Sequence, residues 1–134
     1  MYKILVDTDV LIDFSKGKSL FLKNLLLLQS KSGASLYITP VNITEFLNDE
    51  VLIEKRKFEE AMEFLENFKT LGIDKQIGVL AGKFLREKET SYIADALVAA
   101  LCVEKKLVLA TRNIKHFQRI TNLKFFDEEN SQFN

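Results

Sequence analysis

Residues 3–14 read KILVDTDVLIDF, an apolar run followed by three carboxylates within seven positions. The apolar run at residues 4–6 predicts a buried strand, and Asp7, Asp9 and Asp13 follow its end. A carboxylate at the end of a buried strand loses hydration, so it needs hydrogen bonds or a cation in compensation. The nature of that compensation decides both the local fold and the chemistry.

The composition is that of one ordinary globular domain. The chain has 134 residues, 47% apolar and 28% charged, and nineteen basic residues balance nineteen acidic ones. Binding of a polyanion therefore depends on a local patch rather than on net charge. A single cysteine, Cys102, excludes an internal disulfide and favours a cytoplasmic location. We expect a domain over residues 1–127, a polar tail over residues 128–134, and no membrane span.

Predicted strands and helices alternate along the chain. Strands are expected at residues 3–6, 36–38 and 107–110, with weaker candidates near residues 71–73 and 124–126. Helices are expected from about Val10, over residues 19–32, from Asn42, and over residues 58–68, 77–85 and 93–103. Short strands separated by helices require crossover connections, which predicts an α/β fold with a mainly parallel sheet.

Four acidic or polar positions fall beyond the carboxyl ends of these strands, where sites lie in parallel sheets. Asp7 follows the first strand, and residues 111–113 (TRN) follow the strand near the end of the chain. Glu45 lies in the expected first turn of the helix after the second strand. Asp95 is the only charged residue in its apolar helix. All four positions are expected to converge on one cleft.

Each acid also has a purely structural explanation. Asp7 can accept hydrogen bonds in a turn, Asp9 can be the N-cap of the short helix, and Glu45 can complete a capping box. Asp95 can stabilise a helix N-terminus, although a lone carboxylate among ten apolar neighbours is costly. Asp13 is expected to face solvent.

Together, the acids indicate a metal site. Clustered carboxylates raise one another's pKa values unless a cation offsets their charge. Oxygen ligands suit Mg²⁺ or Mn²⁺, and a zinc site is disfavoured because the chain has one histidine, His116, and one cysteine. One histidine also leaves no second base for cleavage through a ribose hydroxyl. The remaining chemistry is attack of a metal-activated water on a phosphodiester.

Four segments in this order resemble the PIN domain, most closely in the form of VapC-type toxins of toxin–antitoxin pairs. They are residues 7–13 (DTDVLID), 44–45 (TE), 93–100 (IADALVAA) and 109–117 (LATRNIKHF). The resemblance covers nearly the whole chain. It implies a three-layer α/β/α domain, an endoribonuclease that uses Mg²⁺ or Mn²⁺, an RNA substrate, a cognate antitoxin protein and a homodimer.

By position, the resemblance assigns the catalytic acids to Asp7, Glu45 and Asp95. Asp7 and Asp95 would bind the metal directly, whereas Glu45 would bind through water or orient the nucleophile. Asp9 matches a polar position that steadies the site, and Thr111 matches a hydroxyl position beside it.

Asn113 departs from the family pattern, because many relatives have a fourth acid there. Its amide oxygen can still bind a metal, but one negative charge is missing, so a second ion would bind more weakly. Arg112 and Lys115 are expected to hold phosphates, as is Arg119. A solvated basic turn is the alternative for Lys115 and Arg119, and His116 is expected to be structural, capping a helix or facing solvent.

Residues 20–28 (LFLKNLLLL) are apolar on more sides than one sheet can cover. This surplus predicts a contact surface. We expect Leu22, Leu25 and Leu26, with Phe46, to form the groove that binds the antitoxin.

Two other interpretations remain open. The DTD of residues 7–9 is similar to the D-x-D of haloacid-dehalogenase-like phosphatases, but Leu11 stands where that family has Thr or Val. Receiver domains have adjacent acids at the first strand end, which this chain lacks. The second interpretation is a catalytically impaired PIN-like module, disabled at Asn113, that binds RNA without cleaving it.

Overall fold

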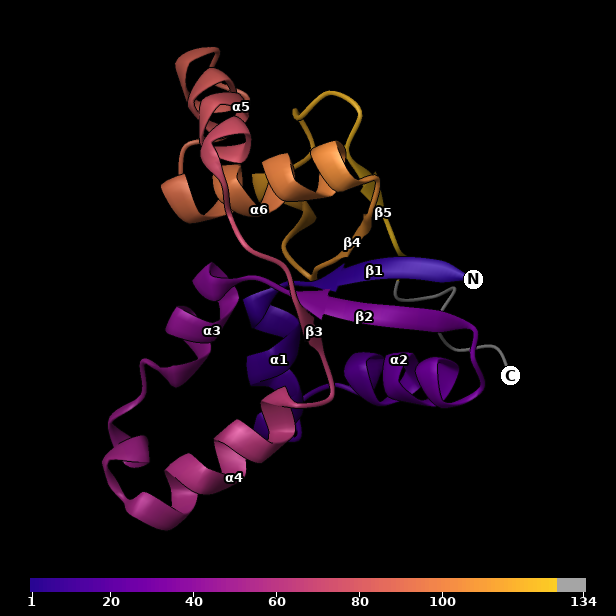
Figure 1. Cartoon of the computed structure of the whole chain (residues 1–134), viewed down its shortest axis with the longest axis vertical. Helices are drawn as coiled ribbons and strands as arrows, with labels where there is room; N and C mark the ends of the chain where they lie inside the picture. The colour runs from indigo at the N-terminus through magenta and orange to yellow at the C-terminus, as the bar shows by residue number, and fades with distance from the viewer. Residues whose placement is uncertain (128–134) are drawn as a thin grey trace.

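The computed structural model describes residues 1–127, and the predicted polar tail lies outside them (Figure 1). Within these residues, five parallel strands form one sheet in the order β3-β2-β1-β4-β5. The strands are β1 (Tyr2–Val6), β2 (Ala34–Ile38), β3 (Lys69–Thr70), β4 (Val108–Ala110) and β5 (Lys124–Phe125). The prediction of a parallel α/β sheet is confirmed.

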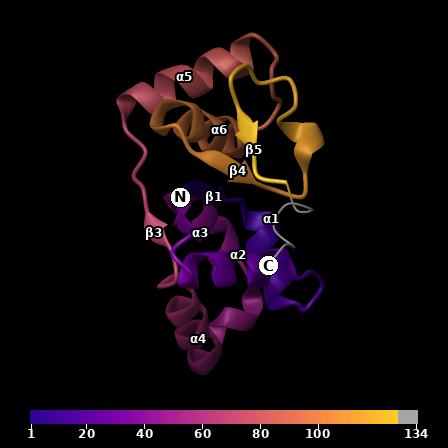
Figure 2. The ribbon, with the colours of Figure 1, turned by 90° about the vertical axis from the view of Figure 1, so that its right-hand side faces the viewer.

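Helices cover both faces of this sheet, which confirms the three-layer arrangement (Figures 1 and 2). One layer contains α1 (Thr8–Ser15), α2 (Phe21–Ser30) and α4 (Lys55–Leu65), and the other contains α5 (Lys75–Arg86) and α6 (Ile93–Lys105). Helix α3 (Pro40–Leu47) lies beyond the carboxyl ends of the strands (Figure 1). Two short 3₁₀ helices complete the order, η1 (Glu50–Ile53) and η2 (Ile114–His116).

Strand β1 shows why the sheet is buried on both sides. Ile4 and Val6 pack into the core under α1 and α2, whereas Leu5 points into the core under α5 and α6. All three side chains are fully buried. A parallel strand covered on both faces therefore reads as a continuous apolar run.

Two predicted helix starts are wrong. Helix α1 begins at Thr8, with Asp7 at its N-cap, so Asp9 is a first-turn residue and not the cap. Helix α3 begins at Pro40, because Thr39 and Asn42 form the capping box between them. Proline suits the first helical position, since the N–H group it lacks has no partner there. Glu45 is consequently free of any capping role.

Two of the leucines assigned to the antitoxin groove are not available to a partner. Leu22 and Leu25 are fully buried, because α2 packs on β2 and against α1. Leu26 and Phe46 are partly buried against the same core. A helix wedged between a sheet and a second helix buries more than one face, which explains its excess of leucine.

No helix within residues 1–127 combines the length and apolar content needed to cross a membrane.

Candidate active site

An open cavity of about 420 Å³ lies at the carboxyl edge of the sheet. We call it the carboxylate cavity. Its lining residues are Asp7, Thr8, Asp9, Ile12, Glu45, Tyr92, Ala94, Asp95, Asn113 and His116. The three acids that were predicted to be catalytic, Asp7, Glu45 and Asp95, thus line one cavity. Asn113, which differs from the family pattern, lines it as well.

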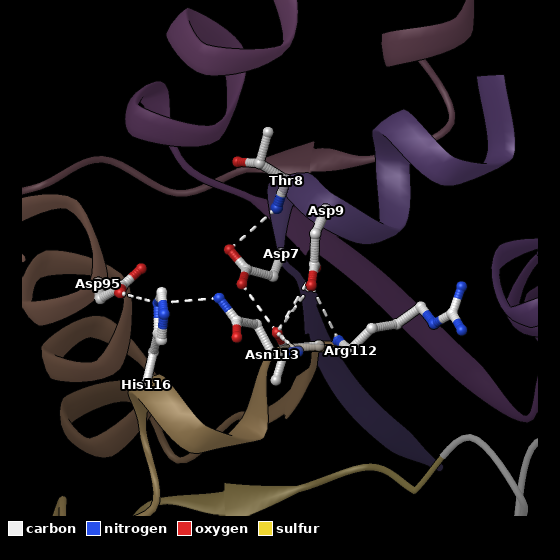
Figure 3. A network of polar contacts seen from close by, with 8 residues as sticks. Asp7, Thr8, Asp9, Asp95, Arg112, Asn113 and His116 are labelled. Atoms are coloured by element: carbon white, nitrogen blue, oxygen red, sulfur yellow. Dashed lines mark hydrogen bonds and ion pairs between the residues drawn. The ribbon is translucent and has the colours of Figure 1, made fainter. Parts of the chain in front are cut away.

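Asp7 is the most buried of the acids that line this cavity. Its N–H group donates to the carbonyl of Ala110 at 2.9 Å, which extends the pairing of β1 with β4 by one residue. Its side chain accepts hydrogen bonds from the Thr8 N–H group and the Thr111 hydroxyl, each at 2.9 Å (Figure 3).

Burial is the largest influence on the Asp7 carboxyl and raises its pKa to about 7; the charges of Asp9 and, more weakly, Asp95 act in the same direction. The hydrogen bonds from Thr111 and Thr8 oppose this shift without cancelling it. Near neutral pH, an added cation would compete directly with a proton for this group.

Asp9 holds the loop that follows β4. One of its oxygens accepts a hydrogen bond from the N–H group of Arg112 at 3.1 Å. Thr111 lies between the two acids, nearer to Asp7 than to Asp9, and its hydroxyl accepts from the N–H group of Asn113 at 3.0 Å. Burial raises the pKa of Asp9 too. Asp9 therefore positions Thr111 and Asn113 at the cavity.

Arg112 and Asp13 form an ion pair that the sequence did not reveal. The guanidinium Nη1 lies 2.9 Å from a carboxylate oxygen of Asp13, and both side chains are partly exposed. The prediction that Asp13 only faces solvent is wrong. Since one nitrogen of Arg112 is held in this way, its guanidinium is less available to a phosphate than we expected.

Glu45 reaches the cavity through a chain of oriented hydrogen bonds. The hydroxyl of Thr8 donates to Glu45 Oε1 at 2.6 Å and accepts from the amide nitrogen of Asn42 at 3.0 Å. The amide of Asn42 is itself oriented, because its oxygen accepts from the N–H group of Thr39. Asn42 is fully buried, so these bonds fix the direction of the Thr8 hydroxyl.

Thr8 and Asn42 are site residues that were not expected from the sequence. Their positions relative to Glu45 and Asp7 could have predicted this role. Asn42 precedes Glu45 by three positions on one helix, which puts both side chains on one face. Thr8 directly follows the strand-end acid Asp7.

Asp95 and Asn113 both contact His116 (Figure 3). The Nδ1 atom of His116 lies 3.0 Å from an oxygen of Asp95 and 2.8 Å from the amide nitrogen of Asn113. The ring stacks on Tyr92 with centroids 4.9 Å apart. Burial raises the pKa of Asp95, whereas the hydrogen bond and charge of His116 lower it. His116 thus belongs to the cavity wall, not to a helix cap or a solvated turn.

The chemistry of these donors fits Mg²⁺ or Mn²⁺. No group of three acidic, histidine or cysteine side chains within residues 1–127 forms a closed metal cluster. Magnesium does not require one, because it keeps several waters and binds through one or two carboxylates. The charges of Asp7 and Asp95 interact, as do those of Asp95 and Glu45, so a cation between them would relieve the repulsion.

Comparison with known proteins identifies relatives over almost the whole chain. The PIN domain family matches residues 4–123. Ribonuclease VapC1 of Methanocaldococcus jannaschii is 32% identical in an alignment of 133 positions that covers 94% of this chain and 88% of that protein.

Solved structures share the fold. VapBC2 from Rickettsia felis bound to a DNA fragment from their promoter aligns with a TM-score of 0.75 and 21% identity, covering 92% of this chain and 97% of that chain. DNA-bound VapBC from Salmonella typhimurium aligns with a TM-score of 0.78 and 20% identity, covering 96% and 99%. At these identities the likeness supports the architecture alone.

Proposed function

The chain belongs to the PIN domain family, and from this premise we propose that it is a metal-dependent endoribonuclease, the toxin of a toxin–antitoxin pair. One observation carries the proposal: acids from three separate segments, Asp7, Glu45 and Asp95, line a single cavity at the sheet edge. The relative from Methanocaldococcus jannaschii is named a ribonuclease, which supports RNA as the substrate.

Asp7 and Asp95 would hold a Mg²⁺ or Mn²⁺ ion, and Asn113 would offer an additional amide oxygen. The bound ion would lower the pKa of a coordinated water and offset the charge of the scissile phosphate. Thr111 and Thr8 hold the two oxygens of Asp7 in place.

Glu45 is suited to orient the attacking water. The Oε1 atom of Glu45 accepts a hydrogen bond from the Thr8 hydroxyl, whereas Oε2 accepts no hydrogen bond from the described residues. Oε2 can therefore accept a hydrogen bond from water, and then its proton. The expected products are RNA fragments with a 5′-phosphate and a 3′-hydroxyl.

Incubation of the purified protein with structured RNAs, in Mn²⁺ or in EDTA, tests this function. We expect cleavage only with the metal, and loss of cleavage in Asp7→Asn. Asp49→Asn is the matched control, because Asp49 caps η1, is not among the residues that line the cavity, and can be replaced by asparagine, which caps equally well. Equal cleavage by wild type and Asp7→Asn would contradict the assignment. RNA binding without cleavage at every metal concentration would favour the impaired module instead.

We place the antitoxin in a different groove from the one expected on α2. A groove of about 850 Å³ runs between α1, α3, η1 and α4. Its aromatic wall contains Phe14, Phe46 and Phe64, with ring centroids 5.4–5.6 Å apart between Phe64 and the other two. Glu45 lines both this groove and the carboxylate cavity. A segment seated in the groove would therefore end against the catalytic acids.

Two surface variants with similar exposure discriminate between the two grooves. Val51 lines the aromatic groove and is 51% exposed, whereas Leu27 lies on α2 and is 50% exposed. We expect Val51→Asp to lose a co-expressed antitoxin in a pull-down and Leu27→Asp to retain it. The opposite result would return the antitoxin interface to α2.

A further inference from the structure

A second pocket shares His116 and Tyr92 with the carboxylate cavity. It has a volume of about 250 Å³ and is lined by residues of two segments, 88–92 and 115–119. We call it the basic pocket. His116 and Tyr92 line both it and the carboxylate cavity, so one strand of nucleic acid could run from one to the other.

Cations dominate this pocket. Lys88, Lys115 and Arg119 line it, and none of the three forms an ion pair with another residue in the described part of the chain. The single acid of the lining is Glu89, whose Oε1 accepts hydrogen bonds from the N–H group and the hydroxyl of Thr121. Glu89 therefore ties the two segments together, and the lining keeps an excess of positive charge.

Thr90 gives independent evidence for a ligand. This residue lines the pocket and is only 7% exposed. Its hydroxyl is buried and has no hydrogen-bond partner among residues 1–127, the one side-chain atom there in that condition. An unpartnered buried hydroxyl costs stability, so its presence calls for a partner that the protein itself does not supply.

We propose that the basic pocket binds a phosphate group of the RNA strand adjacent to the scissile phosphate. This assignment rests on the proposed ribonuclease function. The three cations attract the phosphate, and rotation of the Thr90 side chain lets its buried hydroxyl donate a hydrogen bond to one of the phosphate oxygens. The shared wall of His116 and Tyr92 then lies between this phosphate and the one at the carboxylate cavity.

Binding of a 3′-labelled, 5′-hydroxyl RNA oligonucleotide in EDTA, followed by fluorescence anisotropy, tests the pocket without cleavage. The triple variant Lys88→Gln/Lys115→Gln/Arg119→Gln should raise Kd about tenfold. The slope of log affinity against log salt should fall by about 0.7 for each phosphate that the variant no longer neutralises. A control triple with Lys75, Lys83 and Arg86 changed to Gln removes the same charge from α5. An equal loss of affinity in both triples would indicate a diffuse effect of charge and overturn the pocket.

Thr90→Val separates a built site from mere positive charge. Valine removes the hydroxyl at nearly constant volume, and because that hydroxyl has no partner within the fold, the melting temperature should not fall. We expect Kd for the RNA to rise about fivefold with an unchanged salt slope, and Thr90→Ser to bind like wild type. Wild-type affinity in Thr90→Val would refute the site.

Two further comparisons identify the source of the phosphate and separate this proposal from the ribonuclease function. The Lys88→Gln/Lys115→Gln/Arg119→Gln variant, the pocket triple, should lose the same affinity for 5′-hydroxyl RNA as for 5′-phosphate RNA. A loss seen only with 5′-phosphate RNA would mean that the pocket recognises the end of the strand, and it would overturn the assignment to the phosphate adjacent to the scissile one. An unchanged KM for cleavage in the pocket triple would overturn the pocket while the nuclease function stands. Weaker RNA binding by the triple, in a protein that cleaves no RNA, would support the pocket and contradict only the nuclease function.

Discussion

Replacing Asp7 by Asn should stabilise the metal-free protein at alkaline pH. Burial raises the pKa of Asp7 from 3.8 to about 7, so the folded state binds this proton more tightly than the unfolded state. The stabilising effect of the proton is complete below pH 3.8, falls as pH rises, and is lost above pH 7. The ionised carboxylate thus destabilises the folded protein where a nuclease would normally work.

The magnitude follows from the shift. Each pKa unit corresponds to about 1.4 kcal/mol of folding free energy, and the pKa of Asp7 is raised by roughly three units. The raised pKa of Asp7 therefore destabilises the folded protein by about 4 kcal/mol at pH 8, and by about 2 kcal/mol at pH 5, where the folded state keeps its proton. Asparagine keeps the acceptor for the Thr8 N–H group, and the Thr111 hydroxyl can turn toward Asp9 at 3.4–3.5 Å. The advantage of Asp7→Asn over wild type should therefore grow by about 2 kcal/mol between pH 5 and pH 8.

Urea unfolding in EDTA at both pH values measures this difference. The chain has no tryptophan, so far-UV circular dichroism of the helices is the suitable signal. Asp49→Asn, at a residue that does not line the carboxylate cavity, is the control variant in the same measurement. Added Mg²⁺ should stabilise wild type at pH 8 and leave Asp7→Asn nearly unchanged. An Asp7→Asn protein less stable than wild type at pH 8, or a difference that does not change with pH, would refute the reasoning.

Three further predictions concern single residues. Thr8→Val removes the hydrogen-bond donor to Glu45 and should lower kcat for RNA cleavage about tenfold or more with little change in KM, whereas Thr8→Ser should keep the wild-type kcat. An unchanged kcat in Thr8→Val would show that Glu45 does not need the hydrogen bond from Thr8. Asn113→Asp adds a carboxylate to the cavity and should tighten Mn²⁺ binding about tenfold in calorimetry, whereas weaker binding would exclude position 113 from the metal site. Leu25→Asp places a charge in the core and should cost about 4 kcal/mol or more in urea unfolding, unlike Leu27→Asp, and a stable Leu25→Asp protein would contradict the observed packing.

The sequence by itself determined the parallel α/β fold and the meeting of Asp7, Glu45 and Asp95. The apolar run of β1 and the apolar stretch of α6 are visible in the local sequence, and the alternation of strands and helices requires crossovers. Parallel crossovers put the ends of β1 and β4 at one edge of the sheet, so acids there could be expected to converge.

Only the tertiary structure decided how these acids are held and which apolar faces are covered. The pair of Arg112 with Asp13 joins residues 99 positions apart, and the bond from Thr8 to Glu45 joins residues 37 positions apart. Such interactions leave no periodic trace, because they depend on where whole helices dock. The same reason explains α2: Leu22 and Leu25 look like surplus in the sequence, and they are core because β2 and α1 enclose them.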